Sequence, residues 1–107
     1  MWEGGSMIFV LTETWPCSAL VEVAKEGAKL AGTPPSNMKM LGPYLVMGGD
    51  GVKDYAIYEV ENGQADKALS EIIGRLSGLF RIPGYRASLE VAMTQTQALQ
   101  SVGSKAS

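Results

Sequence analysis

Residues 38–61 read MKMLGPYLVMGGDGVKDYAIYEVE, and this stretch decides the fold because it predicts two β-strands joined by a tight reversal. The reversal is GGDG at 48–51, where three residues lack a Cβ atom and the aspartate tolerates left-handed backbone geometry. The β-branched and aromatic residues of 44–47 and 55–58 are typical of strands. Gly-Pro at 42–43 interrupts the first strand. Because proline cannot donate to a ladder, this strand is predicted to lie at a sheet edge or to carry a bulge, with the second strand inside the sheet.

Upstream of the hairpin the chain predicts a strand followed by a helix. Met7–Thr14 is apolar on both faces over its first half, as in strands that are covered on both sides. Trp15-Pro16 ends this strand, and proline suits the first turn of a helix. The predicted helix ends at Gly32, and its apolar face comprises Leu20, Val23, Ala24, Gly27, Ala28 and Ala31.

Downstream of the hairpin the chain predicts a second helix and a last strand. Asn62-Gly63 precedes the helix, and its apolar stripe comprises Ala65, Ala68, Leu69, Ile72, Ile73, Leu76 and Leu79. Residues 85–93 alternate polar with apolar, as a half-buried strand does. The remainder, 94–107, is rich in Gln, Ser and Thr and predicts a short helix with a loose end.

The resulting order, β-α-β-β-α-β, is the α+β split βαβ or ferredoxin-like arrangement. Right-handed crossovers place both helices on one face of a four-stranded antiparallel sheet. The length of 107 residues suits one domain. We expect residues 1–6 to be a leader or cloning remnant and residues 7–107 to form the domain, with a loosely ordered C-terminal tail.

The other face of the predicted sheet has no helix to cover it. We expect Phe9, Leu11 and Ile57 on this open face. Since a soluble monomer seldom exposes an apolar patch larger than several hundred Å² or so, the sequence predicts a homodimer in which two open sheet faces pack together.

Composition argues against several classes of partner and location. The net charge of −2 and the pI near 5.0 give no basic surface for nucleic acid. Cys17 is the only cysteine, which fits a reducing compartment. No apolar run approaches the roughly 18 residues of a membrane span, and the first residues lack the basic start of a signal peptide. We therefore expect a cytoplasmic protein with no nucleic-acid or membrane partner.

Turn and strand motifs extend over most of Met7 to Met93: GTPP at 32–35, KMLG at 39–42, the glycine-rich turn, and YAIYE at 55–59. Together they resemble small uncharacterised bacterial domains of the dimeric α/β-barrel superfamily. The resemblance implies a ferredoxin-like dimer. That superfamily includes cofactor-free monooxygenases, muconolactone-type isomerases, haem-dependent enzymes and ligand-binding modules of transcription regulators. This chain has no histidine, so the histidine-based sites and the proximal haem ligand have no counterpart here, and we expect no cofactor.

Three glutamates on neighbouring predicted strands are the candidate catalytic residues: Glu13, Glu59 and Glu90. If they share one sheet face, crowding would raise the pKa of one carboxyl and create an acid–base or metal-binding cluster. The alternative, which we favour, is that they are solvated or paired with Arg86 and with lysines across the dimer. We expect no metal, because hard cations need several convergent oxygens.

Four aromatic residues could line a pocket for a flat aromatic molecule, or else pack in the core or interface. With Arg86 they form the predicted ligand-binding set: Trp15, Tyr44, Tyr55 and Tyr58.

Two functions remain open. The first, which we prefer, is a non-catalytic dimeric module that binds a small apolar or aromatic metabolite. The second is a cofactor-free monooxygenase or isomerase that uses a cleft glutamate and a tyrosine. A cavity with one of the three glutamates beside a tyrosine hydroxyl would favour the enzyme, and a cleft filled by side chains would favour the module.

Overall fold

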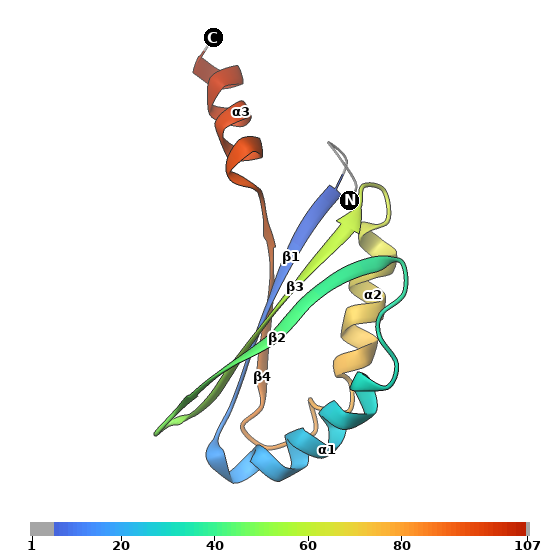
Figure 1. Cartoon of the computed structure of the whole chain (residues 1–107), viewed down its shortest axis with the longest axis vertical. Helices are drawn as coiled ribbons and strands as arrows, with labels where there is room; N and C mark the ends of the chain where they lie inside the picture. The colour runs from blue at the N-terminus through green and yellow to red at the C-terminus, as the bar shows by residue number, and fades with distance from the viewer. Residues whose placement is uncertain (1–5, 107) are drawn as a thin grey trace.

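The computed structural model describes residues 6–106 and has the predicted element order, including the predicted helix after the last strand (Figure 1). Most of the predicted leader, residues 1–5, lies outside the described residues, and Ser6 already belongs to the first strand. The elements are β1 (Ser6–Trp15), a 3-10 turn (Cys17–Ala19), α1 (Leu20–Ala31), β2 (Met38–Gly48), β3 (Gly51–Glu61), α2 (Ala65–Leu76), β4 (Arg86–Ala92) and α3 (Gln95–Ala106).

The four strands form one antiparallel sheet in the order β2-β3-β1-β4, which confirms the ferredoxin-like topology. β2 is an edge strand, and its pairing with β3 is irregular between Leu41 and Tyr44, where Gly42 and Pro43 lie. Both features predicted from the proline are therefore confirmed. The missing backbone donor is tolerated because the bulge falls on an outer strand.

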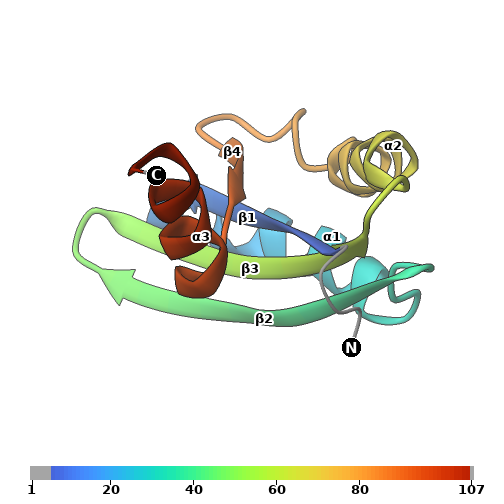
Figure 2. The same ribbon diagram turned by 90° about the horizontal axis from the view of Figure 1, so that it is seen from above.

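α1 and α2 lie on one face of the sheet, where side chains of both helices meet the same strand residues; Figure 1 shows them on one side of the strands, and Figure 2 gives the view from above. The strand register decides which residues meet them. Leu11 pairs with Ala56, and Val10 pairs with Ile57. Phe9 and Leu11 are each 1% exposed beneath the helices, so placing them with Ile57 on the open face was wrong. In an antiparallel pair, residues directly opposite share a face, and Ile57 shares its face with Val10.

The helical layer is packed unevenly against the sheet. From its predicted apolar stripe, α2 buries Ala68, Ile72 and Leu76, whereas Ile73 is 55% exposed. The segment after α2 adds further buried side chains. α1 buries only Val23, and most of its predicted apolar face is exposed. The helix-side core consists of Phe9, Leu11, Trp15, Ala19, Val23, Val52, Ala56, Tyr58, Val60, Ala68, Ile72, Leu76, Leu79, Ile82 and Tyr85.

The connection from α1 to β2 is tied to α2 by side-chain hydrogen bonds. Arg75 donates through Nη2 to the carbonyl oxygen of Leu30 at 3.2 Å and through Nη1 to that of Thr33. Glu71 accepts from the backbone N–H of Ser36 at 2.6 Å and from its hydroxyl at 3.0 Å. These charge-assisted bonds fix the loop against α2.

α3 projects beyond the end of the sheet (Figure 1). A reciprocal cap starts it: Thr94 Oγ1 accepts from the Gln97 N–H at 3.1 Å, and Gln97 Oε1 accepts from the Thr94 N–H at 2.8 Å. Leu99 and Val102 are 63% and 64% exposed. None of the helices in the described range has the length and hydrophobicity needed to cross a bilayer.

The glycines of the hairpin turn provide a test of the fold. Gly51 has φ +136°, and a Cβ there would overlap the carbonyl oxygen of Trp15, whereas a Cβ on Gly49 would meet nothing within 4 Å. We expect Gly51→Ala to lower the free energy of unfolding by about 1–3 kcal/mol and Gly49→Ala to change it by less than about 0.5 kcal/mol. Urea denaturation of both variants measures the difference, and equal stabilities would contradict the described turn.

Candidate functional site

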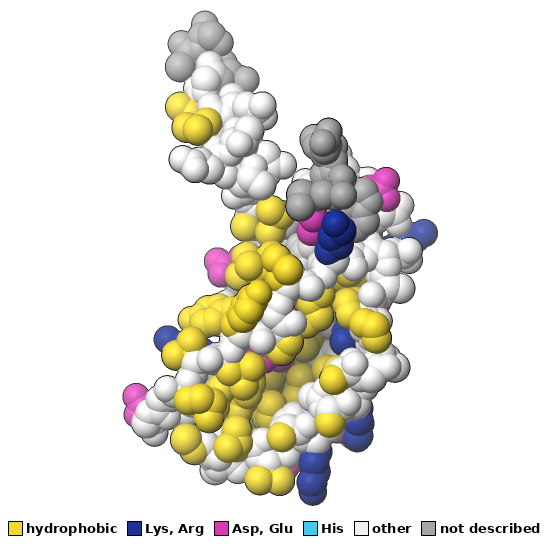
Figure 3. Space-filling view, viewed as in Figure 1, with side chains coloured by type: hydrophobic (Ala, Val, Ile, Leu, Met, Phe, Trp, Pro, Cys, Tyr) yellow, Lys and Arg dark blue, Asp and Glu magenta, His cyan; other side chains and the backbone are white. Residues whose placement is uncertain are grey.

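A cavity of about 330 Å³ lies between the helix face of the sheet, the two helices and the α1–β2 connection. Its size falls within the range of small-molecule sites, roughly 300–1,000 Å³. Figure 3 shows hydrophobic side chains gathered around a hollow between β2 and α1. The cavity exists because α1 is sparsely packed against the sheet. Its apolar wall comprises Leu11, Trp15, Val23, Leu30, Met40, Leu76 and Leu79.

Two carboxyl groups stand side by side on this wall. Glu13 of β1 and Asp54 of β3 are cross-strand partners and point to the helix side, where they are only 7% and 8% exposed. Two buried carboxylates directly opposite each other repel, and each loses its hydration. The arrangement is favourable only if one of them holds a proton.

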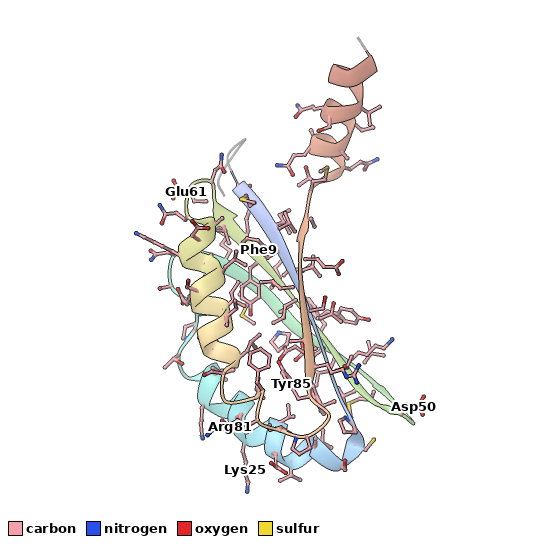
Figure 4. The ribbon with its side chains drawn as sticks, turned by 180° about the vertical axis from the view of Figure 1, so that it is seen from behind. Phe9, Lys25, Asp50, Glu61, Arg81 and Tyr85 are labelled. Carbon is pink, nitrogen blue, oxygen red and sulfur yellow. The ribbon has the colours of Figure 1, made fainter. Side chains whose placement is uncertain are left out.

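An aromatic cluster supports the acid pair. The hydroxyl of Tyr85 donates to Glu13 Oε2, and the Tyr85 ring stacks on Trp15 with centroids 6.3 Å apart and planes at 21°. Phe80 packs edge-on against Tyr85 at 5.8 Å. Figure 4 shows Tyr85 on the helix side of the sheet. The phenol therefore holds Glu13 in place and satisfies one of its oxygens.

Two buried polar atoms on the cavity wall have no hydrogen-bond partner among the described residues: Asp54 Oδ1 and Trp15 Nε1. One is an acceptor and the other is a donor. Unpaired buried groups of this kind are rare in folded proteins because each costs about 1–3 kcal/mol. They are available to a bound molecule.

The pKa values follow from burial and from the pairing of the two acids. The pKa of Asp54 is raised to about 7, first by burial, then by the charge of Glu13 and by the hydrogen bond with Glu13. Burial also raises the pKa of Glu13, but hydrogen bonds from Tyr85 and Asp54 favour its ionised form. Near neutral pH Asp54 is therefore partly protonated, and the two carboxyl groups titrate as a coupled pair.

The two buried tyrosines are donors rather than bases at neutral pH. Burial, followed by the charge of Glu13, raises the pKa of Tyr58 to about 12. Burial and the hydrogen bond to Glu13 raise the pKa of Tyr85 as well. Asp54 has a pKa close to neutrality, so this group suits proton transfer at neutral pH.

The structure divides the predicted site residues between the two faces of the sheet. Odd-numbered residues of β1 pair with even-numbered residues of β3, so Glu13 lies on the helix side with Trp15 and Tyr58. The three-glutamate cluster does not form, because the sheet separates Glu13 from the other two. The residues on the open face are Tyr44, Tyr55, Glu59, Arg86 and Glu90.

Asp54 and Tyr85 are site residues that the sequence reasoning missed. For Asp54 a signal was present: it alternates in phase with Val52, Ala56 and Tyr58, so an acid occupies the buried phase of β3. For Tyr85 no local signal existed, because it precedes β4 in a connection and reaches Glu13 across 72 positions of sequence.

The polar groups of the cavity suit an organic ligand. Within residues 6–106 no three acidic or cysteine side chains converge as metal ligands.

Comparisons of the chain with models of protein families, with curated proteins and with solved structures find no match. Function is therefore inferred from the geometry of the site.

The raised pKa of Asp54 predicts a pH dependence of stability. The folded state keeps this proton up to about pH 7, whereas the unfolded state loses it near 3.8, so stability falls as pH rises through this window. The substitution Asp54→Asn removes the titrating carboxyl and with it this loss of stability at higher pH.

We therefore expect the stability of Asp54→Asn relative to wild type to rise between pH 4.5 and 8 by at least about 1.4 kcal/mol, the equivalent of one pKa unit. Urea denaturation across this range, with a ¹³C NMR titration of the Asp54 carboxyl, measures the effect. Parallel pH profiles for the two proteins would contradict it.

Proposed function

We propose that the protein binds a small, mainly apolar or aromatic molecule in the cavity between its sheet and helices. The observation that carries this proposal is an apolar cavity of about 330 Å³ whose wall includes two buried polar atoms without partners. Binding sites combine these features, since apolar walls supply affinity and a few polar groups supply orientation.

The cavity is preformed rather than a gap that side chains could close. Pro34 and Pro35 of the α1–β2 connection line it, and Arg75 and Glu71 fasten the residues on either side of these prolines to α2. A preformed site binds with a smaller loss of conformational freedom.

Gly27 offers a direct test of ligand binding. It lines the cavity from α1, and a Cβ built on it meets nothing within 4 Å. We expect Gly27→Leu to fold at least as stably as wild type, because leucine is the better helix former, and to weaken ligand binding at least roughly tenfold by filling the cavity.

Gly74→Leu is the matched control, because Gly74 is an exposed glycine of α2 with equally open space around it. A fragment library screened by ligand-observed NMR, followed by calorimetry on the hits, provides the readout. Hits that bind wild type and both variants equally would argue against the cavity as the site.

We further propose that two copies pack through their open sheet faces, as in the dimeric α/β-barrel superfamily that the sequence resembles. Leu41, Tyr44 and Val46 are 57%, 57% and 55% exposed on this face, beside half-buried Val10 and Ile57. An apolar surface of this kind is typical of an interface.

The charges of the open face support one orientation of such a dimer. Lys53 and Arg86 both pair with Thr14, near one end of β1. Glu59 and Glu90 pair with residues toward the other end. The face therefore has a basic end and an acidic end.

A two-fold axis across the strands lays the basic end of one sheet over the acidic end of the other. Lys53 then faces Glu59 of the partner subunit, and Arg86 approaches Glu90 of the partner subunit. An axis along the strands would stack the two basic ends on each other, at an electrostatic cost. Lys39 beside Glu59 reduces the acidic charge without reversing it.

This orientation predicts a charge-reversal effect. We expect Arg86→Glu to weaken dimerisation roughly tenfold, because two symmetric contacts become repulsive, and the double variant Arg86→Glu, Glu90→Arg to restore it. Sedimentation velocity over a concentration series measures the association. Arg81→Glu, an exposed change in the segment after α2, serves as the control. A double variant as weak as the single one would contradict the orientation.

A second candidate function is acid–base catalysis without a cofactor, as in the monooxygenase or isomerase alternative. Its specific support is Glu13 in the cavity beside the Tyr85 hydroxyl, with Asp54, whose pKa is about 7, as the group that takes up and releases a proton. The NMR screen distinguishes the two functions, since an enzyme would convert a bound hit whereas a binding module would return it unchanged.

We also propose a reducing, cytoplasmic location for the protein. Its single cysteine, Cys17, is exposed as a free thiol at the start of the 3-10 turn. Exposed unpaired thiols persist most readily in reducing compartments.

A further inference from the structure

We infer that the molecule bound in this cavity is an organic cation: a primary or secondary amine on a small apolar or aromatic body, with its nitrogen held by Glu13 and Asp54. The inference rests on the proposed ligand-binding function and specifies the class of ligand. Three features of the cavity carry it, namely an unpaired acceptor, an uncompensated negative charge and an aromatic wall.

The unpaired acceptor is Asp54 Oδ1. It is buried on the wall of the cavity, in a residue that is 8% exposed, and has no donor among the described residues. Glu13, by contrast, already accepts from the Tyr85 hydroxyl. A molecule that completes the site must therefore donate a hydrogen bond at Asp54, and an ammonium group carries two or three N–H donors.

The negative charge distinguishes an amine from a neutral donor. Glu13 and Asp54 face each other on the wall of an apolar cavity, and one proton shared between them leaves the pair with a negative charge. A hydroxyl would satisfy the hydrogen bond and leave this charge uncompensated. A cation satisfies both needs.

Arg75 is the one basic residue among the described residues that line the cavity, and it does not neutralise the pair. Its Nη1 and Nη2 atoms donate to the carbonyl oxygens of Thr33 and Leu30, on the loop side. Among the described residues, the acid pair therefore has no direct cationic partner.

The aromatic wall favours the same ligand class. Trp15 and Tyr58 line the cavity, and Trp15 lies two residues from Glu13 on the same face of β1. Aromatic faces attract ammonium groups because the face of the ring is the negative part of its quadrupole. The unpaired Trp15 Nε1 would donate to an acceptor, such as a hydroxyl, on the body of the ligand.

The test compares three probes of matched shape on the full chain by calorimetry: 2-phenylethylamine, 2-phenylethanol and 3-phenylpropanoate. We expect the amine to bind wild type at least about tenfold more tightly than the alcohol, and the anion to bind most weakly. In the variant Glu13→Gln, Asp54→Asn, which keeps the shape and removes the charge, we expect the amine to lose this advantage while the alcohol keeps its wild-type affinity.

Equal binding of amine and alcohol to wild type would overturn the cation inference and leave the proposed function standing. Failure of all three probes, and of the fragment screen, would overturn both. The wild-type comparison needs no variant, so a double variant that fails to fold does not weaken it. An amine advantage that persists in the folded double variant would show that the acid pair is not the recognition element, and would overturn the inference.

Discussion

The pairing register of β1 and β3 controls both the core and the cavity of this protein. It sets Glu13 opposite Asp54 and Leu11 opposite Ala56, and so decides which side chains of both strands lie beneath the helices. A slip of β3 by one residue against β1 would turn Asp54 outward and bring Ile57 beneath the helices, so the two acids would no longer share a face. The observed register buries two carboxyl groups at a cost, which the shared proton and the Tyr85 hydroxyl offset.

Uneven packing of the two helices creates the space that this acid pair faces. α2 packs Ala68, Ile72 and Leu76 against the sheet. α1 buries only Val23 there, and its Gly27 has no side chain to occupy the space. The missing side-chain volume becomes a cavity because the α1–β2 connection is fastened to α2 and cannot collapse inward. Side chains would fill this space in a closely packed core. Here it stays open beside buried polar groups, which is the arrangement found in small-molecule binding sites.

The sheet also separates two kinds of chemistry. Its helix side holds the cavity and the acid pair. Its open side has basic residues at one end, acidic residues at the other and apolar residues between them. Alternation along each strand lets one short sequence serve both faces, since neighbouring residues such as Lys53 and Asp54 belong to different surfaces. A ligand in the cavity and a second copy on the open face would therefore not compete for the same residues.

Turn residues and hydrophobic periodicity are local signals, and they were enough to predict the ferredoxin-like order of elements, the hairpin, and the edge position and bulge of β2. It also pointed to Glu13, Trp15 and Tyr58 as site residues, and all three line the cavity. Two features could not be predicted in this way: Glu59 and Glu90 lie on the other face of the sheet, and Asp54 and Tyr85 join Glu13. The register between strands, and the reach of Tyr85 from a loop to Glu13, depend on contacts between residues far apart in the chain, and no local pattern encodes those contacts.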